Sequence, residues 1–236
     1  LARCRRSLRE LRIPVTYMDE ELTAIHNDII EKSGIKDGSI YFQITRGIAK
    51  RTHYFPDKVV PLLSMTIREG KPNAKNQKEG IRCMFFEDIR WLRCDIKTMN
   101  LLGNVLAKQA GHEKGLQGTI QYRKDTNLVT EGSSSNFFIV KDGVIWTHPI
   151  SNLILKGVTR SILVEEIIPK LGYTIVEKAF SPEFALTADE AFATSTSLEV
   201  TPVIEIDGKK IGDGKPGPVT ASLLDAYHEL VQKECY

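Results

Sequence analysis

The sequence predicts an α+β fold, and three observations favour it over a doubly wound α/β sheet. Strand-like segments alternate with amphipathic helical segments, but without the strict strand–helix–strand order of a parallel sheet. Two dipeptides, Asp142-Gly143 and Asp207-Gly208, lie between apolar strand-like segments and are typical of tight hairpins. Residues 68–78 are charged, contain glycine and proline and show no apolar periodicity, which is typical of a linker between two domains.

The N-terminal part of the chain predicts two helices followed by two strands. Residues 1–11 carry apolar side chains at helical spacing, and Pro14 ends this helix. Asp19 is expected to cap a second amphipathic helix that stops near Gly34. Segments rich in β-branched and aromatic residues are expected to form strands at 39–46 and 59–67.

Beyond the linker the pattern mixes the two kinds of element. Strands are predicted at 80–86, 118–123, 135–140, 144–147, 173–178, 191–195, 203–206 and 210–211. Helices are predicted at 99–111, 158–171 and 218–233. We therefore predict a small N-terminal domain over residues 1–70, a linker at 71–78 and a larger domain over 79–236.

Composition and charge exclude several function classes. The 236 residues are 42% hydrophobic and 26% charged, which is near the average for globular proteins. Lys and Arg number 32 against 30 Asp and Glu, and a net charge of +2 gives no electrostatic footprint for nucleic acid. No apolar run is long enough to span a bilayer, and the four scattered cysteines form no CxxC pair. We expect a soluble, cytoplasmic protein that binds no nucleic acid, membrane or metal and has free thiols.

One lysine precedes an Ala- and Leu-rich helix. Lys97 follows the apolar Ile96, and burial in such a place lowers the pKa of an amine and makes it a usable nucleophile. Most lysines are solvated surface groups, so this position alone is a weak signal.

A polar segment, Thr-Glu-Gly-Ser-Ser-Ser-Asn at residues 130–136, runs into an apolar strand. A carboxylate among hydroxyl groups is a poor way to build a core, but it suits a buried charge surrounded by hydrogen-bond donors. The alternative is a serine-rich turn with an exposed Glu131. The spacing does not distinguish the two.

A third segment, Leu-Lys-Gly-Val-Thr-Arg at residues 155–160, leads into a helix that starts near Val158. Free backbone N–H groups at a helix N-terminus attract anions, although an ordinary helix cap explains the pattern equally well. A run of hydroxyl residues at 194–197 ends another apolar strand. Two hydroxyl-rich loops and one helix N-terminus on the same side would suit a phosphate.

Together, these segments resemble the class IV pyridoxal-phosphate aminotransferases in order and spacing. The matching motifs are Asp95-Ile96-Lys97 with Asn100-Leu101-Leu102, then residues 130–136, then residues 155–160. Within that family the similarity is greatest to the bacterial D-amino-acid transaminases and extends from Leu1 to about Gly214. The resemblance implies the two-domain fold-type IV architecture, with pyridoxal 5'-phosphate in the interdomain cleft, and a homodimer.

The resemblance also assigns roles to individual residues. Lys97 would hold the cofactor as an internal aldimine and shuttle the α-proton, and Glu131 would pair with the pyridine nitrogen. Leu155 would pack against the ring. The phosphate would be bound by Arg3, Val158, Thr159, Ser195 and Thr196. Arg51 and His53 would bind the substrate's α-carboxylate, since a guanidinium can donate two parallel hydrogen bonds.

The implied activity is a ping-pong transamination. D-Alanine would donate its amino group to the cofactor, and 2-oxoglutarate would collect it as D-glutamate. The same scaffold supports a 4-amino-4-deoxychorismate lyase or another class IV transaminase, but Arg51 and His53 favour the D-amino-acid enzyme. A further alternative is a truncated, non-catalytic member, because the family begins with strands ahead of Leu1, one of which supplies a tyrosine for the carboxylate.

Overall fold

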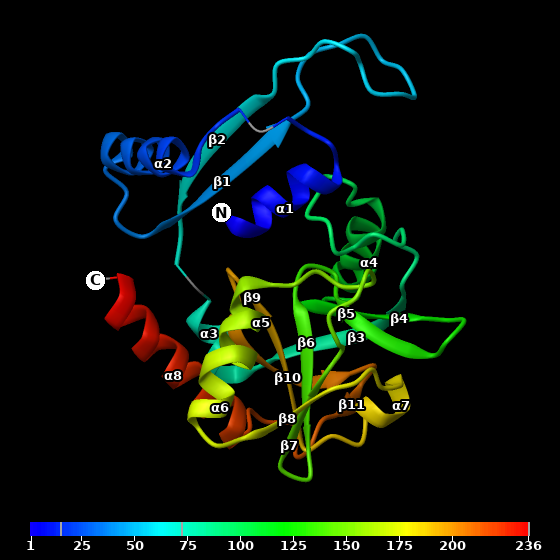
Figure 1. Ribbon diagram of the computed structural model, residues 1–236. Helices are drawn as coiled ribbons and strands as arrows, with labels where there is room; N and C mark the ends of the chain where they lie inside the picture. The colour runs from blue at the N-terminus through cyan, green and yellow to red at the C-terminus, as the bar shows by residue number, and fades with distance from the viewer. Residues whose placement is uncertain (15, 72, 236) are drawn as a thin grey trace. The chain divides into compact units, whose positions relative to one another are not determined.

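The computed structural model describes residues 1–14, 16–71 and 73–235 (Figure 1). The chain divides into two compact units. The first unit comprises Leu1–Lys71 together with Ile96–Thr98, and the second comprises the other described residues. The three residues 96–98, far along the chain, therefore cluster with the N-terminal part.

The first unit contains two helices and a two-stranded antiparallel sheet. Its elements are α1 (Ala2–Glu10), α2 (Asp19–Ser33), β1 (Gly38–Thr45) and β2 (Leu62–Glu69). Ile40 of β1 lies opposite Ile67 of β2. Helix α2 covers this sheet, and its His26 ring meets the Phe42 ring edge-on at 5.1 Å between centroids. Leu22 of α2 is completely buried.

All four elements expected here are present, with two local corrections. Asp19 does not cap α2: the N-cap is Met18, and the Asp19 carboxylate instead accepts a hydrogen bond from Arg5 Nε at 2.6 Å. Strand β2 begins at Leu62 rather than at residue 59, because Pro61 has no N–H group to give to the sheet. Gly34 ends α2 with a φ of 66°, a left-handed conformation that glycine adopts without strain.

The second unit is built on a nine-stranded mixed sheet. The strands are β3 (Ile81–Glu87), β4 (Gly118–Arg123), β5 (Leu128–Gly132), β6 (Asn136–Lys141), β7 (Val144–Thr147), β8 (Thr174–Glu177), β9 (Glu190–Ser195), β10 (Glu199–Ile206) and β11 (Lys209–Lys210). Their order is β5-β4-β3-β10-β9-β6-β7-β8, with β11 paired to β10. Parallel and antiparallel pairs occur in the same sheet, which confirms the predicted α+β class.

Helices cover this sheet. They are α3 (Ala74–Glu79), α4 (Leu102–Glu113), α5 (Val158–Ile162), a π-helical turn (Leu163–Ile167), α6 (Ile168–Lys170), α7 (Pro182–Ala185) and α8 (Pro218–Cys235). Residues 158–170 are continuously helical, as the sequence predicts for 158–171. Among the described residues, no helix combines the length and the apolar character needed to cross a membrane.

Strand β6 is buried on both faces, so it contributes to two hydrophobic clusters. Phe137 and Ile139 pack in one cluster with Ile120 and Val203, whereas Phe138 packs in the other with α8 and the π-helical turn. Successive side chains of a strand point to opposite faces, which explains the division.

Both predicted hairpins are confirmed. Asp142 and Gly143 have φ angles of 51° and 75°, and Asp207 and Gly208 have φ angles of 52° and 74°. Two successive positive φ values are the signature of the type I′ turn that matches strand twist.

Three elements were not predicted from the sequence. The sequence did not predict strand β5, because the polar residues Thr130 and Glu131 interrupt its apolar character. Helix α3 lies in the segment predicted as a linker, and α7 is a single turn capped by Ser181, whose hydroxyl accepts from the Phe184 N–H. Cys4, Cys83 and Cys94 are free thiols, and the described residues include no His, Cys, Asp and Glu cluster fit for a metal.

Candidate active site

Glu131 lies on β5 and is buried, with only 5% of its surface exposed. Its carboxylate accepts hydrogen bonds from Arg90 Nη1 at 2.6 Å, Asn136 Nδ2 at 2.8 Å and the Leu155 backbone N–H at 3.1 Å. Burial raises the pKa of Glu131 to about 7, against the opposing effect of the Arg90 charge. The segment therefore holds a buried carboxyl group surrounded by hydrogen-bond donors, and an exposed Glu131 is excluded.

Behind Glu131 lies an ionic network that no sequence motif indicates. Arg90 donates to both oxygens of Asp88, from Nε at 2.9 Å and from Nη2 at 2.7 Å. Thr130 Oγ1 donates to Asp88 at 2.7 Å, and Arg123 Nε lies 3.5 Å from the same carboxylate. Two carboxylates and two guanidinium groups thus balance one another away from water.

The pKa directions in this network follow from its geometry. Burial alone would raise the pKa of Asp88, but the hydrogen bonds and charge of Arg90 outweigh it and hold that pKa below its usual range. Burial would lower the pKa of Arg90, but Asp88 and Glu131 raise it. The sequence signal for the network is a cluster of charged residues at 87–95, beginning at the last residue of β3.

Asn136 connects Glu131 to the start of α5. Its Nδ2 donates to Glu131 and to the Leu155 carbonyl, both at 2.8 Å. A Cβ placed on Gly157 would lie 2.2 Å from Asn136 Oδ1, so only glycine fits at this approach. The side chain of Leu155 is partly exposed.

Gly157 is also the N-cap of the helix that begins at Val158. No side-chain hydrogen bond caps this N-terminus. Val158 is exposed and Thr159 is buried. Uncapped N–H groups at the start of a helix that continues to Lys170 form an environment suited to an anion.

The hydroxyl-rich turn follows strand β9, which pairs with β6. Thr194 of β9 lies opposite Asn136 of β6, and its buried Oγ1 has no hydrogen-bond partner in the described structure. Ser195 is half-buried and Thr196 is exposed. The second unit thus brings Glu131, Leu155 and the α5 N-terminus together around Asn136, with Ser195 and Thr196 at the end of the neighbouring strand.

In the first unit, the segment with Lys97 contacts α1. The Lys97 backbone N–H donates to Ser7 Oγ at 3.2 Å, and Arg3 lies one helical turn before Ser7. Burial lowers the pKa of Arg3. The side chain of Lys97 is exposed, and the expected desolvation of its amine stays a prediction.

Arg51 and His53 lie together in the exposed loop between β1 and β2. The Arg51 guanidinium Nη2 is 3.3 Å from His53 Nε2. A guanidinium only donates, so this contact requires His53 Nε2 to be an acceptor. Both side chains are exposed and open to a ligand.

Comparisons with known proteins identify the family. Residues 1–206 match the family described as amino-transferase class IV. The chain belongs to the class IV aminotransferases. The D-alanine aminotransferase of Staphylococcus haemolyticus is 43% identical over 232 residues, covering 96% of this chain and 80% of that protein. That of Listeria monocytogenes serotype 1/2a (strain 10403S) is 39% identical, covering 97% of this chain and 79% of that protein.

Branched-chain amino acid aminotransferases are among the solved structures that match. The Escherichia coli branched-chain amino acid aminotransferase superposes with a TM-score of 0.91 at 27% identity, covering 97% of this chain and 77% of that one. The branched-chain aminotransferase of the archaeon Thermoproteus uzoniensis, solved with norvaline, has a TM-score of 0.84 at 26% identity, covering 99% and 78%. The predicted family and its fold are confirmed.

Class IV aminotransferases use pyridoxal 5'-phosphate, and one solved branched-chain relative contains pyridoxamine 5'-phosphate. The residues of this chain fit that cofactor. The uncapped helix start at Gly157 and the unpaired hydroxyl of Thr194 suit a phosphate. The buried carboxylate of Glu131 suits a protonated ring nitrogen. The family assignment therefore agrees with the local chemistry of the second unit.

Proposed function

We propose that this chain is a D-amino-acid aminotransferase that moves the amino group of D-alanine to 2-oxoglutarate by a ping-pong mechanism, giving pyruvate and D-glutamate. The observation that carries this proposal is the 43% identity to a D-alanine aminotransferase across 96% of the chain. The branched-chain relatives share the fold at a much lower identity of 27%.

Glu131 is proposed to hold the proton at the cofactor's ring nitrogen. When bound, pyridoxal phosphate withdraws electrons from the substrate's α-carbon and makes the α-proton acidic. A carboxylate with a pKa of about 7 is only partly ionised at neutral pH, and a protonated ring nitrogen beside it would favour the ionised form. Arg90, Asn136 and the Leu155 N–H orient this carboxylate.

Lys97 is proposed to carry the cofactor and then to move the α-proton of the substrate. Its backbone is fixed by Ser7, so the amine is presented from a defined position of the first unit. Arg3, on the same face of α1 as Ser7, is proposed to bind the phosphate. Val158 and Thr159 would add N–H groups, Ser195 and Thr196 would add hydroxyl groups, and Leu155 would cover the ring.

Arg51 and His53 are proposed to bind the substrate's α-carboxylate. Their side chains lie 3.3 Å apart at Nη2 and Nε2, and both are exposed. A guanidinium that donates two parallel hydrogen bonds selects a planar carboxylate, which both substrates of the reaction carry.

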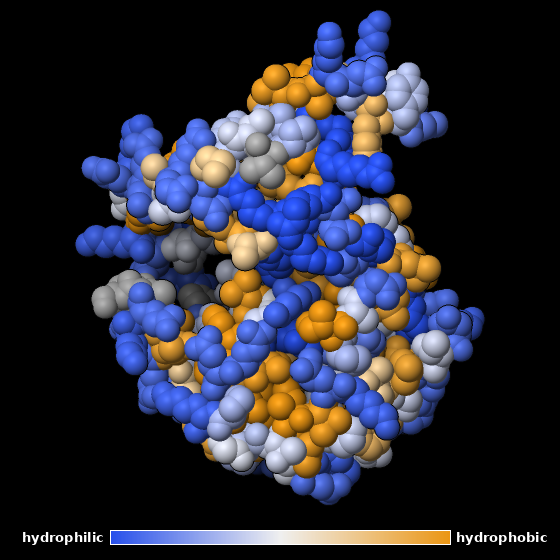
Figure 2. Space-filling view, viewed as in Figure 1, coloured by the Kyte–Doolittle hydropathy of each residue, from blue (hydrophilic) through white to orange (hydrophobic). Residues whose placement is uncertain are grey.

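A homodimer is part of the proposal. Large apolar side chains are exposed in the β1–β2 loop of the first unit, at Ile48, Tyr54, Phe55 and Val60, and around the start of α4 in the second, at Leu92, Met99, Leu102 and Val105. Figure 2 shows such hydrophobic surface among hydrophilic side chains. Patches of this kind mark protein interfaces, so we propose that a second copy covers them. Sedimentation of the purified protein tests whether it is a dimer. We also propose a cytoplasmic location.

The activity is tested with purified protein loaded with pyridoxal phosphate. The glutamate formed from 2-oxoglutarate is measured with D-alanine, L-alanine or L-leucine as the amino donor, since this product is common to all three donors. Turnover with D-alanine, and with neither L-alanine nor L-leucine, supports the proposal. Turnover with L-leucine would favour a branched-chain activity, and pyruvate release from 4-amino-4-deoxychorismate without any 2-oxo acid would favour the lyase.

A further inference from the structure

The turn between β9 and β10 has an unusual backbone. Ser195 and Glu199 face each other as the closing pair of this hairpin, and residues 196–198 form its turn. Glu199 has a φ of 51°, in the left-handed region that residues with a Cβ disfavour. Glycine or asparagine would adopt this backbone with less strain, so the glutamate side chain needs an explanation of its own.

The explanation lies in two helices that hold the Glu199 carboxylate. Gln77 Nε2 of α3 donates to Glu199 Oε2 at 2.7 Å, and His228 Nε2 of α8 lies 2.8 Å from the same oxygen. A carboxylate only accepts, so His228 Nε2 carries the hydrogen. The Glu199 side chain is 14% exposed. We call Gln77, Glu199 and His228 the hairpin clamp.

The clamp is continuous with the turn itself. Gln77 Nε2 also lies 3.4 Å from the Leu198 carbonyl, which accepts from Thr201 Oγ1 at 2.7 Å. The Leu198 N–H donates to Ser195 Oγ at 3.1 Å. The contacts of the clamp therefore reach Ser195, one of the two hydroxyl residues proposed to bind the cofactor phosphate.

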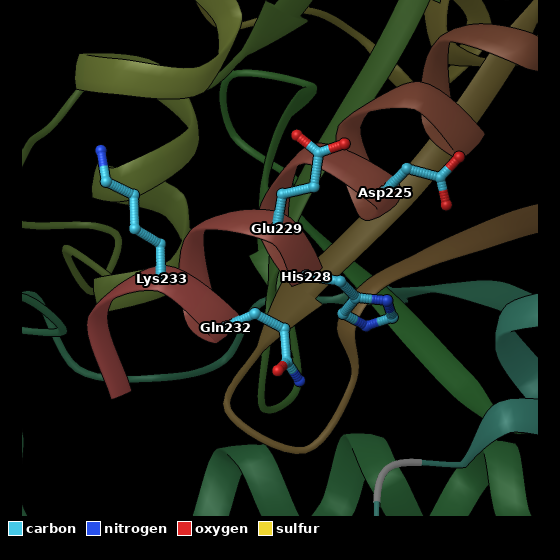
Figure 3. Close-up of a pocket in the computed structure, with 5 residues that line it drawn as sticks. All are labelled: Asp225, His228, Glu229, Gln232 and Lys233. Atoms are coloured by element: carbon cyan, nitrogen blue, oxygen red, sulfur yellow. The ribbon is translucent and has the colours of Figure 1, made fainter. Parts of the chain in front are cut away.

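Helix α8 offers other polar groups near His228, and Figure 3 shows how they are directed. His228 and Gln232 project from one side of the helix, while Glu229 and Lys233 project toward the opposite side. His228 thus faces β10 and Glu199 rather than the acidic Glu229 of its own helix.

We infer that the hairpin clamp is a positioning device for the cofactor phosphate. By fixing Glu199 from two helices, it holds the turn at residues 195–198 in the conformation that presents the hydroxyl groups of Ser195 and Thr196. Preorganised donors bind an anion more tightly than mobile ones, because less order is lost on binding. This inference rests on the proposed function, since it needs these two residues to contact the phosphate.

The test compares two ligands that differ only in the phosphate. Dissociation constants of pyridoxal 5'-phosphate and of pyridoxal are measured by fluorescence titration of the apoprotein. The variant Gln77→Leu with His228→Leu removes both donors and leaves the turn sequence unchanged. Gln232→Leu, on the same side of α8, is the matched control.

If the clamp positions the phosphate site, its removal should weaken the binding of pyridoxal phosphate but not that of pyridoxal. The Kd for pyridoxal phosphate is expected to rise about tenfold in the double variant, as is typical when outer contacts that orient a ligand's partners are removed. The Kd for pyridoxal is expected to stay within about twofold, and Gln232→Leu is expected to leave both constants unchanged. His228→Gln alone keeps a donor at this position and leaves Gln77 in place. Its Kd for pyridoxal phosphate is therefore expected to stay close to that of the wild-type protein.

Three results would overturn the inference, and they distinguish failure of the clamp from failure of the proposed function. Parallel weakening of both ligands, or no weakening of either, would show that the clamp only supports the fold, while the proposed function stands. If the wild-type protein binds pyridoxal as tightly as pyridoxal phosphate, both the proposed phosphate site and the inferred role of the clamp are contradicted.

Discussion

Arg90 and Glu131 form a buried ion pair, with 2.6 Å between Nη1 and Oε1 and with each side chain no more than 6% exposed. Arg90 simultaneously holds both oxygens of Asp88. The Arg90 guanidinium therefore contacts both buried carboxyl groups, with Arg123 also beside Asp88, and this arrangement sets the charge of the group proposed to face the cofactor ring.

Removing Arg90 is expected to be costly. Arg90→Leu leaves Asp88 and Glu131 buried without their main partner, so the free energy of unfolding should fall by about 3–5 kcal/mol. Arg93→Leu is the matched control, because the Arg93 side chain is 43% exposed where it pairs with Asp95, and such pairs contribute about 0–1 kcal/mol. Urea denaturation of the apoprotein measures both. Equal losses in the free energy of unfolding for the two variants would contradict the assignment of Arg90 as the main partner of both buried carboxyl groups.

The raised pKa of Glu131 predicts a pH dependence of stability. The folded apoprotein holds a proton on Glu131 up to about pH 7, whereas an ordinary glutamate releases it near 4.5. Between these values the folded state binds more protons, so this group lowers stability as pH rises. Glu131→Gln should remove that component, and its stability relative to wild type should increase from pH 5 to pH 8. Parallel stability curves would refute the raised pKa.

Gly157 is predicted to tolerate no side chain. Gly157→Ala places a Cβ 2.2 Å from Asn136 Oδ1, which displaces the amide from Glu131 and Leu155. We expect a loss of about 1–3 kcal/mol, the usual range for overpacking, and a weaker affinity for pyridoxal phosphate. Gly70→Ala is the control, since a Cβ there meets no atom within 4 Å. Thermal melting and cofactor titration check both, and a Gly157→Ala protein that binds as wild type would exclude the close approach.

Arg51 is predicted to act on substrate affinity alone. Arg51→Ala removes charge-assisted hydrogen bonds worth about 1.5–3 kcal/mol, so the KM for D-alanine should rise by at least about tenfold. Cofactor affinity should not change. Lys50→Ala removes a neighbouring exposed cation and serves as the control. A loss of cofactor affinity in Arg51→Ala, with an unchanged KM, would place this residue elsewhere in the mechanism.

Much of the fold was predictable because its signals are local. The tight turns at Asp142-Gly143 and Asp207-Gly208 need particular residues, and the amphipathic periods of α1, α2 and α8 fix their extents to within a few residues. Strand β5 was not predictable, because its polar residues are buried only through partners distant in sequence, such as Arg90.

The candidate site was likewise predictable where its signals are local and not where it depends on residues distant in sequence. Short motifs identified Glu131 and the helix start at Val158, but the network of Asp88, Arg90 and Arg123 depends on partners distant in sequence, such as Thr130, 42 positions from Asp88. Asp19 illustrates the reverse error: a local capping rule predicted its role, while the distant Arg5 determines it.

The most direct measurement is the visible absorption spectrum of the protein loaded with pyridoxal phosphate, before and after addition of D-alanine, with L-alanine and the Lys97→Ala variant as controls. We predict that the band of the bound cofactor shifts to that of its amino form with D-alanine, and that neither L-alanine nor the variant gives this shift. A shift of equal rate with L-alanine, or a band indifferent to both alanines, would contradict a D-amino-acid transaminase.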